Sequence, residues 1–389
     1  MSGRGEAAKE RDGQAGDGRA RLGCGDGLTV RGWEKGPFVF DAAILSRKHD
    51  IPADLIWSEE DRPTTDSVDE LDLPVTDLAC FFSGNAETAL EIAKQVGEAC
   101  SKHGFFQVTN HGIDKGLLEE AQRRTEEFFT MSLEEKERAK RNVGEIFGYA
   151  SSLTGRFTSN LPWKETLTIP TNAAEEYMVK TLGDGFQQYG NVLQNYLDAM
   201  NKLVLEILEV LGLSLGVGRW FRDFYSDNDS IFRVNYYPSC PKPDLTLGTG
   251  PHYDPTSITI LHQDEITGLQ VHVDGKWYTV SPKPDTFVIN IGDTFMALTN
   301  KMYKSCLHRA VVNNMSARKS LVFFLCPKKD KIVRPPESLI DAEHPRAYPD
   351  FTWAAMEEFT QKHHRADTQT ANVFAQWLQK TKEKGLTID

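Results

Sequence analysis

The chain has 389 residues, which excludes a very small domain. Its formal net charge is −12, and the sequence contains no basic stripe of the kind that nucleic-acid binding needs. No apolar run reaches the roughly 18 residues that a membrane-spanning helix needs, and the N-terminus lacks the apolar core of a signal peptide. We therefore expect neither nucleic acid nor a membrane as a partner.

Residues 1–36 are rich in Gly and in charges of both signs, and they contain few apolar residues. Such a composition cannot bury a core, so this segment is predicted to be disordered. Ordered sequence is predicted to begin around Phe38–Phe40. An extended lead-in from Ile51 to Pro63 follows, with Trp57 as its anchor.

Residues 37–225 are predicted to form a mixed, mainly helical region, because apolar residues recur there at helical spacing. The expected elements are, in chain order, a strand at 74–78, a helix from about 86 to the closing Gly104, a strand at 105–108, a helix at 114–131, a short helix begun by a capping box at 132–135, a β-type run at 166–169, and a helix from 186 to 211 that Gly212 ends.

From residue 230 the pattern changes to short β-type runs separated by Gly, Pro, Asp and Asn. The runs are 231–237, 257–261, 269–273, 276–280, 287–291, 305–312 and 320–325. Many short strands at regular spacing predict a jelly-roll core, here assigned to 226–335. Two further helices are predicted at 353–363 and 371–382, and residues 336–389 are therefore assigned to a C-terminal helical region. The expected fold class is α+β.

Three side chains of metal-ligand type stand in the β-rich region: His252 and Asp254, two residues apart, and His308. On a strand, residues two apart point to the same face. Two imidazoles and one carboxylate leave coordination positions open, as in the facial triad of non-haem Fe(II) oxygenases. Zinc is the alternative, since the same ligand types build catalytic zinc sites.

Arg318 and Ser320 stand at the start of a buried, strand-like run that Pro327 ends. Arg318, just before the run, would bring its charge to the mouth of an apolar pocket. A planar guanidinium binds a carboxylate through two parallel hydrogen bonds. Zinc chemistry gives no reason for this pair, whereas a dicarboxylate co-substrate of an iron oxygenase does.

The ordered set of Asn235-Tyr236-Tyr237-Pro238, the two His, the Asp, and Arg318-x-Ser320 resembles the plant 2-oxoglutarate-dependent dioxygenases over about residues 74–378. The resemblance implies a double-stranded β-helix that binds Fe(II) and 2-oxoglutarate and uses ascorbate as reductant. It implies that His252, Asp254 and His308 hold the iron. Arg318 and Ser320 would bind the distal carboxylate of 2-oxoglutarate, and Asn235 and Tyr237 would add hydrogen bonds. No catalytic residue is expected beyond the iron centre.

The segment Leu161-Pro162-Trp163-Lys164-Glu165-Thr166 is similar to a segment of gibberellin 20-oxidases that is associated with gibberellin recognition. The likeness implies O2-dependent oxidation of the C-20 methyl of a C20 gibberellin, with loss of that carbon to give a C19 gibberellin. Trp163 would cover a ring face and Lys164 would pair a carboxylate. The ordinary alternatives are a core tryptophan and a solvated surface lysine.

Two other functions stay open on the sequence. The first is the same chemistry on another small molecule, as in a gibberellin 3-oxidase or a flavonoid oxygenase. The second is a non-catalytic hormone-binding protein on the same fold, which a broken triad would favour. The six cysteines form no C-x-x-C pair and indicate reduced thiols, so the cytoplasm is the expected location.

Overall fold

The computed structural model describes residues 39–64, 67–142, 144–152, 160–362 and 370–383. All of them belong to one compact unit that begins at Phe38. The predicted disordered segment 1–36 lies outside the described residues. The predicted boundaries at 225/226 and 335/336 stay predictions.

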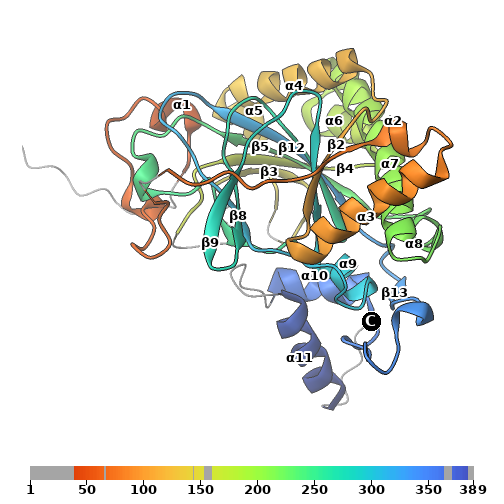
Figure 1. The fold of residues 1–389 in the computed structure, drawn as a ribbon. Helices are drawn as coiled ribbons and strands as arrows, with labels where there is room; N and C mark the ends of the chain where they lie inside the picture. The colour runs from red at the N-terminus through yellow and green to blue at the C-terminus, as the bar shows by residue number, and fades with distance from the viewer. Residues whose placement is uncertain (1–38, 65–66, 143, 153–159, 363–369, 384–389) are drawn as a thin grey trace, which may run out of the picture. The chain divides into compact units, whose positions relative to one another are not determined.

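Two facing sheets form a jelly-roll core (Figure 1). The larger sheet has eight strands, antiparallel except for β1 beside β2, in the order β1 (Val75–Asp77), β2 (Phe105–Thr109), β10 (Phe287–Ile291), β7 (Ile258–Gln263), β12 (Arg318–Leu325), β5 (Ile231–Tyr237), β4 (Glu165–Pro170) and β3 (Gly148–Ser151). The smaller sheet has the order β6 (Thr249–His252), β11 (His308–Ala310), β8 (Leu269–Val273) and β9 (Lys276–Val280). A separate pair joins β13 (Ile332–Val333) to β14 (Phe351–Thr352).

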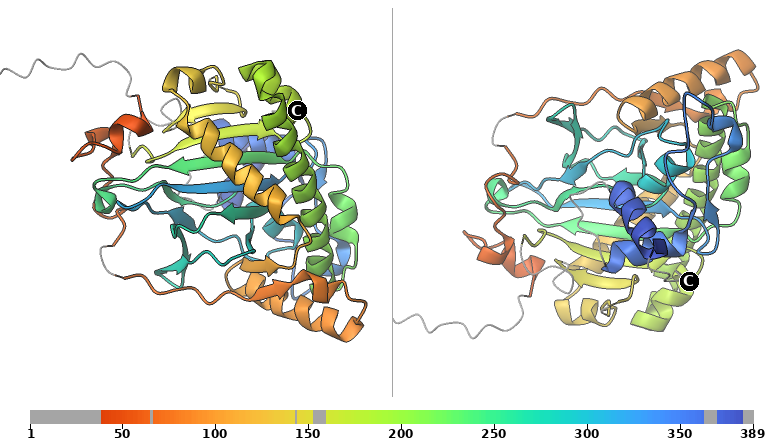
Figure 2. Two further views of the ribbon diagram at one scale, coloured as in Figure 1. Left: turned by 90° about the horizontal axis from the view of Figure 1, so that it is seen from above. Right: turned by 90° about the horizontal axis from the view of Figure 1, so that it is seen from below.

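Helices cover the outer face of the large sheet, where α4 and α7 run across the strands (Figure 2, left). The α-helices are α1 (Ala42–Leu45), α2 (Leu78–Phe81), α3 (Ala86–Lys102), α4 (Lys115–Thr130), α5 (Leu133–Glu137), α6 (Ala174–Leu182), α7 (Gln187–Ser214), α8 (Trp220–Phe224), α9 (Asp293–Leu298), α10 (Trp353–Lys362) and α11 (Thr370–Glu383). Short 3-10 turns are η1 (Ala53–Leu55), η2 (Asp184–Phe186), η3 (Pro243–Leu245) and η4 (Glu337–Leu339).

Strand alternation divides the apolar side chains between two cores. Ile260 of β7 and Leu321 of β12 face the helices and join the largest apolar cluster. Their neighbours Leu261 and Val322 face the small sheet, where they pack with Val271. The sheet therefore separates a helix-packed core from the barrel interior.

Most predicted elements are confirmed, and the capping box of Ser132 and Glu135 is present at α5. The predicted end of the long helix at Gly212 was wrong, because α7 continues to Ser214. A Cβ on Gly212 would lie 1.9 Å from the carbonyl oxygen of Gly218, so this glycine permits a close backbone approach. The sequence also missed α6. The amide of Gln194, on α7, caps its first N–H, which is a tertiary contact (Ala174 N to Gln194 Oε1, 2.8 Å).

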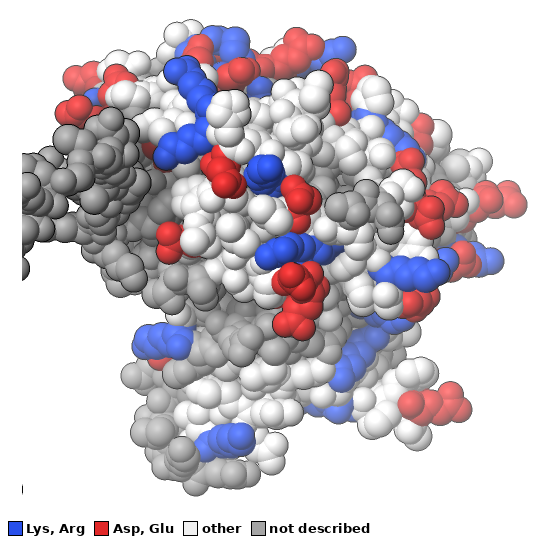
Figure 3. Space-filling model, turned by 90° about the vertical axis from the view of Figure 1, so that its left-hand side faces the viewer, with Lys and Arg blue, Asp and Glu red and all other residues white. Residues whose placement is uncertain are grey.

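On the face shown in Figure 3, Lys and Arg side chains lie among Asp and Glu side chains. Within the described ranges, no helix has both the length and the apolar character that crossing a bilayer requires.

Candidate active site

His252, Asp254 and His308 converge at one point between the two sheets. Their ligand-type atoms all lie within 4.8 Å of one another. Nε2 of His252 lies 3.6 Å from Oδ1 of Asp254, and Nε2 of His308 lies 3.8 Å from Oδ2. The two histidines are direct cross-strand partners on β6 and β11. The cluster therefore presents two imidazole nitrogens and a carboxylate from one side, as the predicted facial triad requires.

The predicted local reason for this convergence needs a correction. β6 ends at His252, so Asp254 lies in the loop after the strand and strand alternation does not aim it. Hydrogen bonds aim it instead: Oδ2 of Asp254 accepts from Thr259 Oγ1 at 2.7 Å and from Asn290 Nδ2 at 2.9 Å. Both donors belong to strands of the large sheet, which joins the loop to the opposite wall of the barrel.

Backbone carbonyl groups orient the two imidazoles. Nδ1 of His252 lies 2.9 Å from the oxygen of Gly250, and Nδ1 of His308 lies 3.1 Å from the oxygen of Cys306. A carbonyl oxygen only accepts, so each Nδ1 must carry the hydrogen and donate. Each Nε2 then keeps its lone pair for a metal.

The protonation states also suit a divalent cation. Burial, reinforced by the neighbouring His308, lowers the pKa of His252 to about 3, so its ring is neutral near pH 7. Burial alone would raise the pKa of Asp254, but the two imidazoles and the hydrogen bonds from Asn290 and Thr259 lower it overall. A neutral His252 ring and an ionised Asp254 carboxylate result, and together with the second imidazole this donor set fits Fe(II).

A buried guanidinium lies at the other end of the site. Arg318, only 3% exposed, begins β12 and does not precede it as predicted. Its Nε donates to the carbonyl oxygen of Ile266 at 3.1 Å, and one terminal nitrogen donates to Oε1 of Gln263 at 2.9 Å. A Cβ on Gly268 would lie 2.7 Å from Cδ of Arg318, so this glycine leaves room for the side chain.

The charge of Arg318 has no acidic partner within ion-pair distance among the described residues. A buried charge without a counter-ion is costly. The arrangement therefore fits a carboxylate ligand that arrives with the co-substrate, and the guanidinium retains donors for it.

Ser320, Asn235 and Tyr237 lie beside Arg318 because β12 and β5 pair in register, Ser320 opposite Asn235 and Arg318 opposite Tyr237. Nδ2 of Asn235 donates to Oγ of Ser320 at 3.2 Å, which leaves the serine hydroxyl hydrogen free to donate elsewhere. The Arg318 guanidinium also lies 5.3 Å from the ring centroid of Tyr237. The structure thus brings together all four residues predicted for 2-oxoglutarate.

Lys164 joins this group, and it is not a solvated surface lysine, since it is 4% exposed. Its Nζ donates to Oγ1 of Thr249 at 2.8 Å and lies 3.4 Å from Oδ1 of Asn235. Burial, with Arg233 and Arg141 nearby, lowers the pKa of Lys164 to about 7, and the Asp254 carboxylate opposes that shift. The buried lysine therefore bridges Asn235, a predicted co-substrate residue, and Thr249, on the strand that ends at His252.

The next residue, Glu165, points to the opposite face of β4. Its carboxylate accepts from Nζ of Lys136 at 2.9 Å and from the hydroxyl of Tyr149 at 2.9 Å, and its side chain is fully buried. Lys136, at α5, also donates to the oxygen of Phe129. This buried ion pair attaches β4 to the helical layer directly behind Lys164.

Trp163 is fully buried within the apolar cluster that contains Tyr237 and Phe40, and its ring meets that of Phe40 edge-on at 5.3 Å. Its indole N–H donates to the oxygen of Pro238 at 2.9 Å. These contacts are those of the core tryptophan that the sequence left as the alternative. They hold the backbone of the segment from which Lys164 extends.

Sequence reasoning missed Thr259, Asn290, Gln263 and Thr249, all of which orient predicted site residues. Each is a common polar residue on a strand, and only its partner across the barrel reveals its role. The spacing between Asp254 and Thr259 carries no recognisable local signal.

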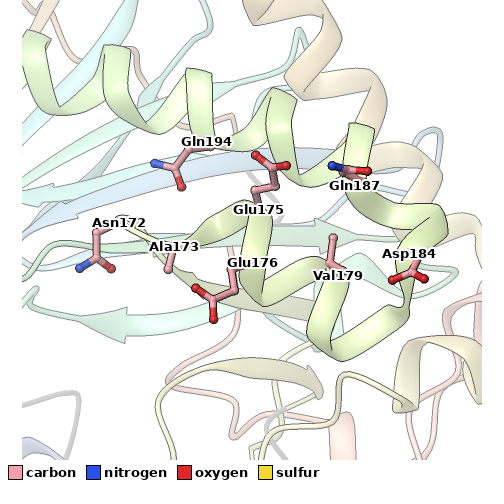
Figure 4. Close-up of a pocket in the computed structure, with 8 residues that line it drawn as sticks. All are labelled: Asn172, Ala173, Glu175, Glu176, Val179, Asp184, Gln187 and Gln194. Carbon is pink, nitrogen blue, oxygen red and sulfur yellow. The ribbon is translucent and has the colours of Figure 1, made fainter.

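Two surface grooves lie elsewhere, and neither includes a predicted site residue. The larger, of about 610 Å³, runs between α6 and α7, with Glu175 and Glu176 on one side and Gln187 and Gln194 on the other (Figure 4). The second, of about 360 Å³, lies between α2, the start of α4 and α7. The predicted site residues therefore lie in the barrel interior and not in these grooves.

Comparisons with known proteins agree with this geometry. The family model of the 2OG-Fe(II) oxygenase superfamily matches residues 228–327, and the model described as non-haem dioxygenase in morphine synthesis N-terminal matches residues 73–189. A crystal structure of JOX2 in complex with 2OG, Fe and JA superposes with a TM-score of 0.71 at 31% identity, covering 86% of this chain and 95% of that one. A crystal structure of a rice dioxygenase for auxin oxidation gives a TM-score of 0.66 at 25% identity, covering 77% and 99%.

Fold, site and family models define a 2-oxoglutarate- and iron-dependent oxygenase. Among curated relatives, gibberellin 20 oxidase 1-A of Triticum aestivum is 56% identical over 356 residues, which are 90% of this chain and 98% of the relative. Gibberellin 20 oxidase 1 of Arabidopsis thaliana is 53% identical over 352 residues, covering 88% and 93%. The chain belongs to the 2OG-Fe(II) oxygenase superfamily and, within it, to the gibberellin 20-oxidase family. This membership decides for iron over the zinc alternative.

Proposed function

We propose that this protein is a gibberellin 20-oxidase that oxidises the C-20 methyl of C20 gibberellins in successive steps and releases C-20 to give C19 gibberellins. The observation that carries the proposal is the intact His252, Asp254 and His308 cluster beside a buried Arg318 that forms no ion pair with an acidic residue in the described part of the chain. The 56% identity to a wheat gibberellin 20 oxidase over nearly the whole chain supports the substrate.

The residues of the site divide into those that would hold the metal and those that would bind the co-substrate. His252, Asp254 and His308 hold Fe(II), which when bound supplies activation of O2. Arg318 and Ser320 bind the distal carboxylate of 2-oxoglutarate, and Asn235 and Tyr237 position the co-substrate and Ser320. In the first hydroxylation, one oxygen atom of O2 enters the substrate C–H bond. The other enters the succinate formed as 2-oxoglutarate loses CO2, so atoms and electrons balance.

We assign the substrate contact to Lys164 and a supporting role to Trp163. The Lys164 ammonium is buried without a carboxylate within hydrogen-bond distance among the described residues, so a gibberellin carboxylate would supply its counter-ion. The packed ring of Trp163 keeps the Lys164 backbone in place. Ascorbate would keep the iron reduced. The five free thiols of the described residues suit a reducing compartment, and we place the protein in the cytoplasm.

The test is a reaction of the purified full-length protein with Fe(II), 2-oxoglutarate, ascorbate, O2 and a C20 gibberellin, with products identified by mass spectrometry. We expect a C19 product together with C-20 alcohol and aldehyde intermediates. A C19 gibberellin and a flavanone serve as alternative substrates. Hydroxylation of either one, with the C20 gibberellin unchanged, would overturn the proposal in favour of another oxygenase. Binding without 2-oxoglutarate consumption would indicate a hormone-binding protein.

A further inference from the structure

The strand that carries the first metal ligand is an edge strand. β6 lies at one end of the four-stranded sheet and pairs with β11 alone. That pairing is irregular between His308 and Ala310, where the register shifts. A single, interrupted ladder constrains an edge strand weakly, so the position of His252 needs support from outside the sheet.

The support comes from Trp57, in the segment that precedes β1. A Cβ on Gly250 would lie 2.1 Å from Cη2 and 2.7 Å from Cζ3 of Trp57, so the six-membered ring of the indole rests directly on the Gly250 backbone. Trp57 is 9% exposed. Its backbone N–H donates to Leu245 at 3.0 Å, and its indole N–H donates to the oxygen of Leu161 at 3.2 Å.

Gly250 is the residue whose carbonyl oxygen accepts from Nδ1 of His252 at 2.9 Å. A displaced Gly250 peptide would turn the imidazole and move its Nε2. We propose that Trp57 is a positioning residue for the metal centre: its ring fixes the Gly250 peptide, which orients His252. Through the hydrogen bond from its indole N–H to Leu161, Trp57 also links β6 to the start of segment 161–166, which contains Lys164. The inference rests on the metal site of the proposed function.

Other groups that orient metal-bound histidines typically contribute 10–100-fold to metal affinity. A tryptophan that only filled the core would contribute to stability and not to metal affinity. The two readings therefore differ in a quantity that can be measured without turnover.

The experiment is an anaerobic titration of the full-length protein with Co(II), followed by visible absorption, without co-substrate or substrate. Trp57→Ala should bind Co(II) about tenfold more weakly and shift the absorption bands. Leu45→Ala is the control, because Leu45, like Trp57, is a buried apolar residue in the segment that precedes β1. It should lower the melting temperature and leave Co(II) affinity unchanged. Equal Co(II) affinity in Trp57→Ala and wild type overturns the inference.

A second pair of variants decides the matter even if Trp57→Ala fails to fold. Gly250→Ala should weaken Co(II) binding, because its new methyl group collides with the indole. Adding Trp57→Phe removes the colliding ring atoms and should restore part of the affinity. No restoration overturns the inference. His308→Ala completes the set: if it binds Co(II) as wild type does, the proposed metal site itself fails, and the inference fails with it.

Discussion

The two ends of the proposed site are built by different means. At the metal end, each histidine is oriented by the carbonyl group of the residue two positions before it, Gly250 for His252 and Cys306 for His308. At the co-substrate end, Arg318, Ser320 and Asn235 meet only because β12, β5 and β4 pair in one register. The contacts that orient the two imidazoles are local in sequence, whereas the co-substrate end depends on long-range strand pairing. We therefore expect the two ends to fail separately.

The largest effect should come from the metal end. His308→Ala removes one of three ligands and should reduce turnover at least about 100-fold under limiting iron, since even outer-shell changes cost 10–100-fold. The neighbours Ala310 and Val312 keep the strand packed, so circular dichroism should be unchanged. His272→Ala on β8 is the control, because His272 packs on Trp277 and lies outside the cluster. Near-normal turnover of His308→Ala would refute the ligand assignment.

Arg318→Lys should separate the two ends. It keeps the charge but loses the planar fork, so the KM for 2-oxoglutarate should rise by an amount corresponding to about 2–5 kcal/mol, while Co(II) affinity stays constant. Lys319→Ala is the matched control on the same strand, since Lys319 points outward to a surface ion pair with Glu126. Steady-state kinetics with varied 2-oxoglutarate would check this. An unchanged KM, or a parallel loss of metal binding, contradicts separate ends.

Lys164 tests the cost of the buried charge through pH. Its folded-state pKa is about 7, against an ordinary value of 10.5. Below pH 7 both states carry the proton, and the native state bears the full cost of the buried ammonium. As pH rises from 7 to 10.5 the native state loses the proton first, so wild type gains stability relative to Lys164→Met. At pH 6 the free energy of unfolding of Lys164→Met should exceed that of wild type by roughly 2–4 kcal/mol, and this difference should be smaller at pH 9.5.

The measurement is urea unfolding of both apo proteins at the two pH values. Lys319→Met controls for removal of a surface lysine and should show no such trend. A pH-independent difference between Lys164→Met and wild type would show that the ammonium is not the source of the cost.

The smallest effect should come from the hydrogen bonds that aim Asp254. Asn290→Ala removes one of two side-chain donors and should weaken Co(II) binding about tenfold, because Thr259 still donates. In the double variant Asn290→Ala, Arg318→Lys, the two losses of turnover should add. Its Co(II) affinity should equal that of Asn290→Ala alone. An Asn290→Ala variant with altered 2-oxoglutarate KM and normal metal affinity would show that the two ends communicate.

The same division explains what could be predicted from the sequence. His252, Asp254 and His308 carry ligand chemistry in their residue types, and Arg318 and Ser320 stand two apart on one strand, so pattern and resemblance identified them. The burial of Lys164 could not be predicted, because it depends on the pairing of β4 with β5 and on Thr249 from the other sheet. Elements stabilised by distant contacts, such as α6 with its cap from Gln194, were missed for the same reason.

The adjacent Lys164 and Glu165 have a consequence for folding fidelity. They carry opposite charges to opposite faces of one chain segment, the lysine inward and the glutamate to its buried partner Lys136. A slip of one residue would exchange the faces. It would put a carboxylate at the proposed contact for the acidic substrate, and it would place Lys164 facing Lys136 behind the strand. A misthreaded barrel would thus repel its own ligand, so the charge order of two neighbouring residues discriminates against the wrong assembly as well as stabilising the right one.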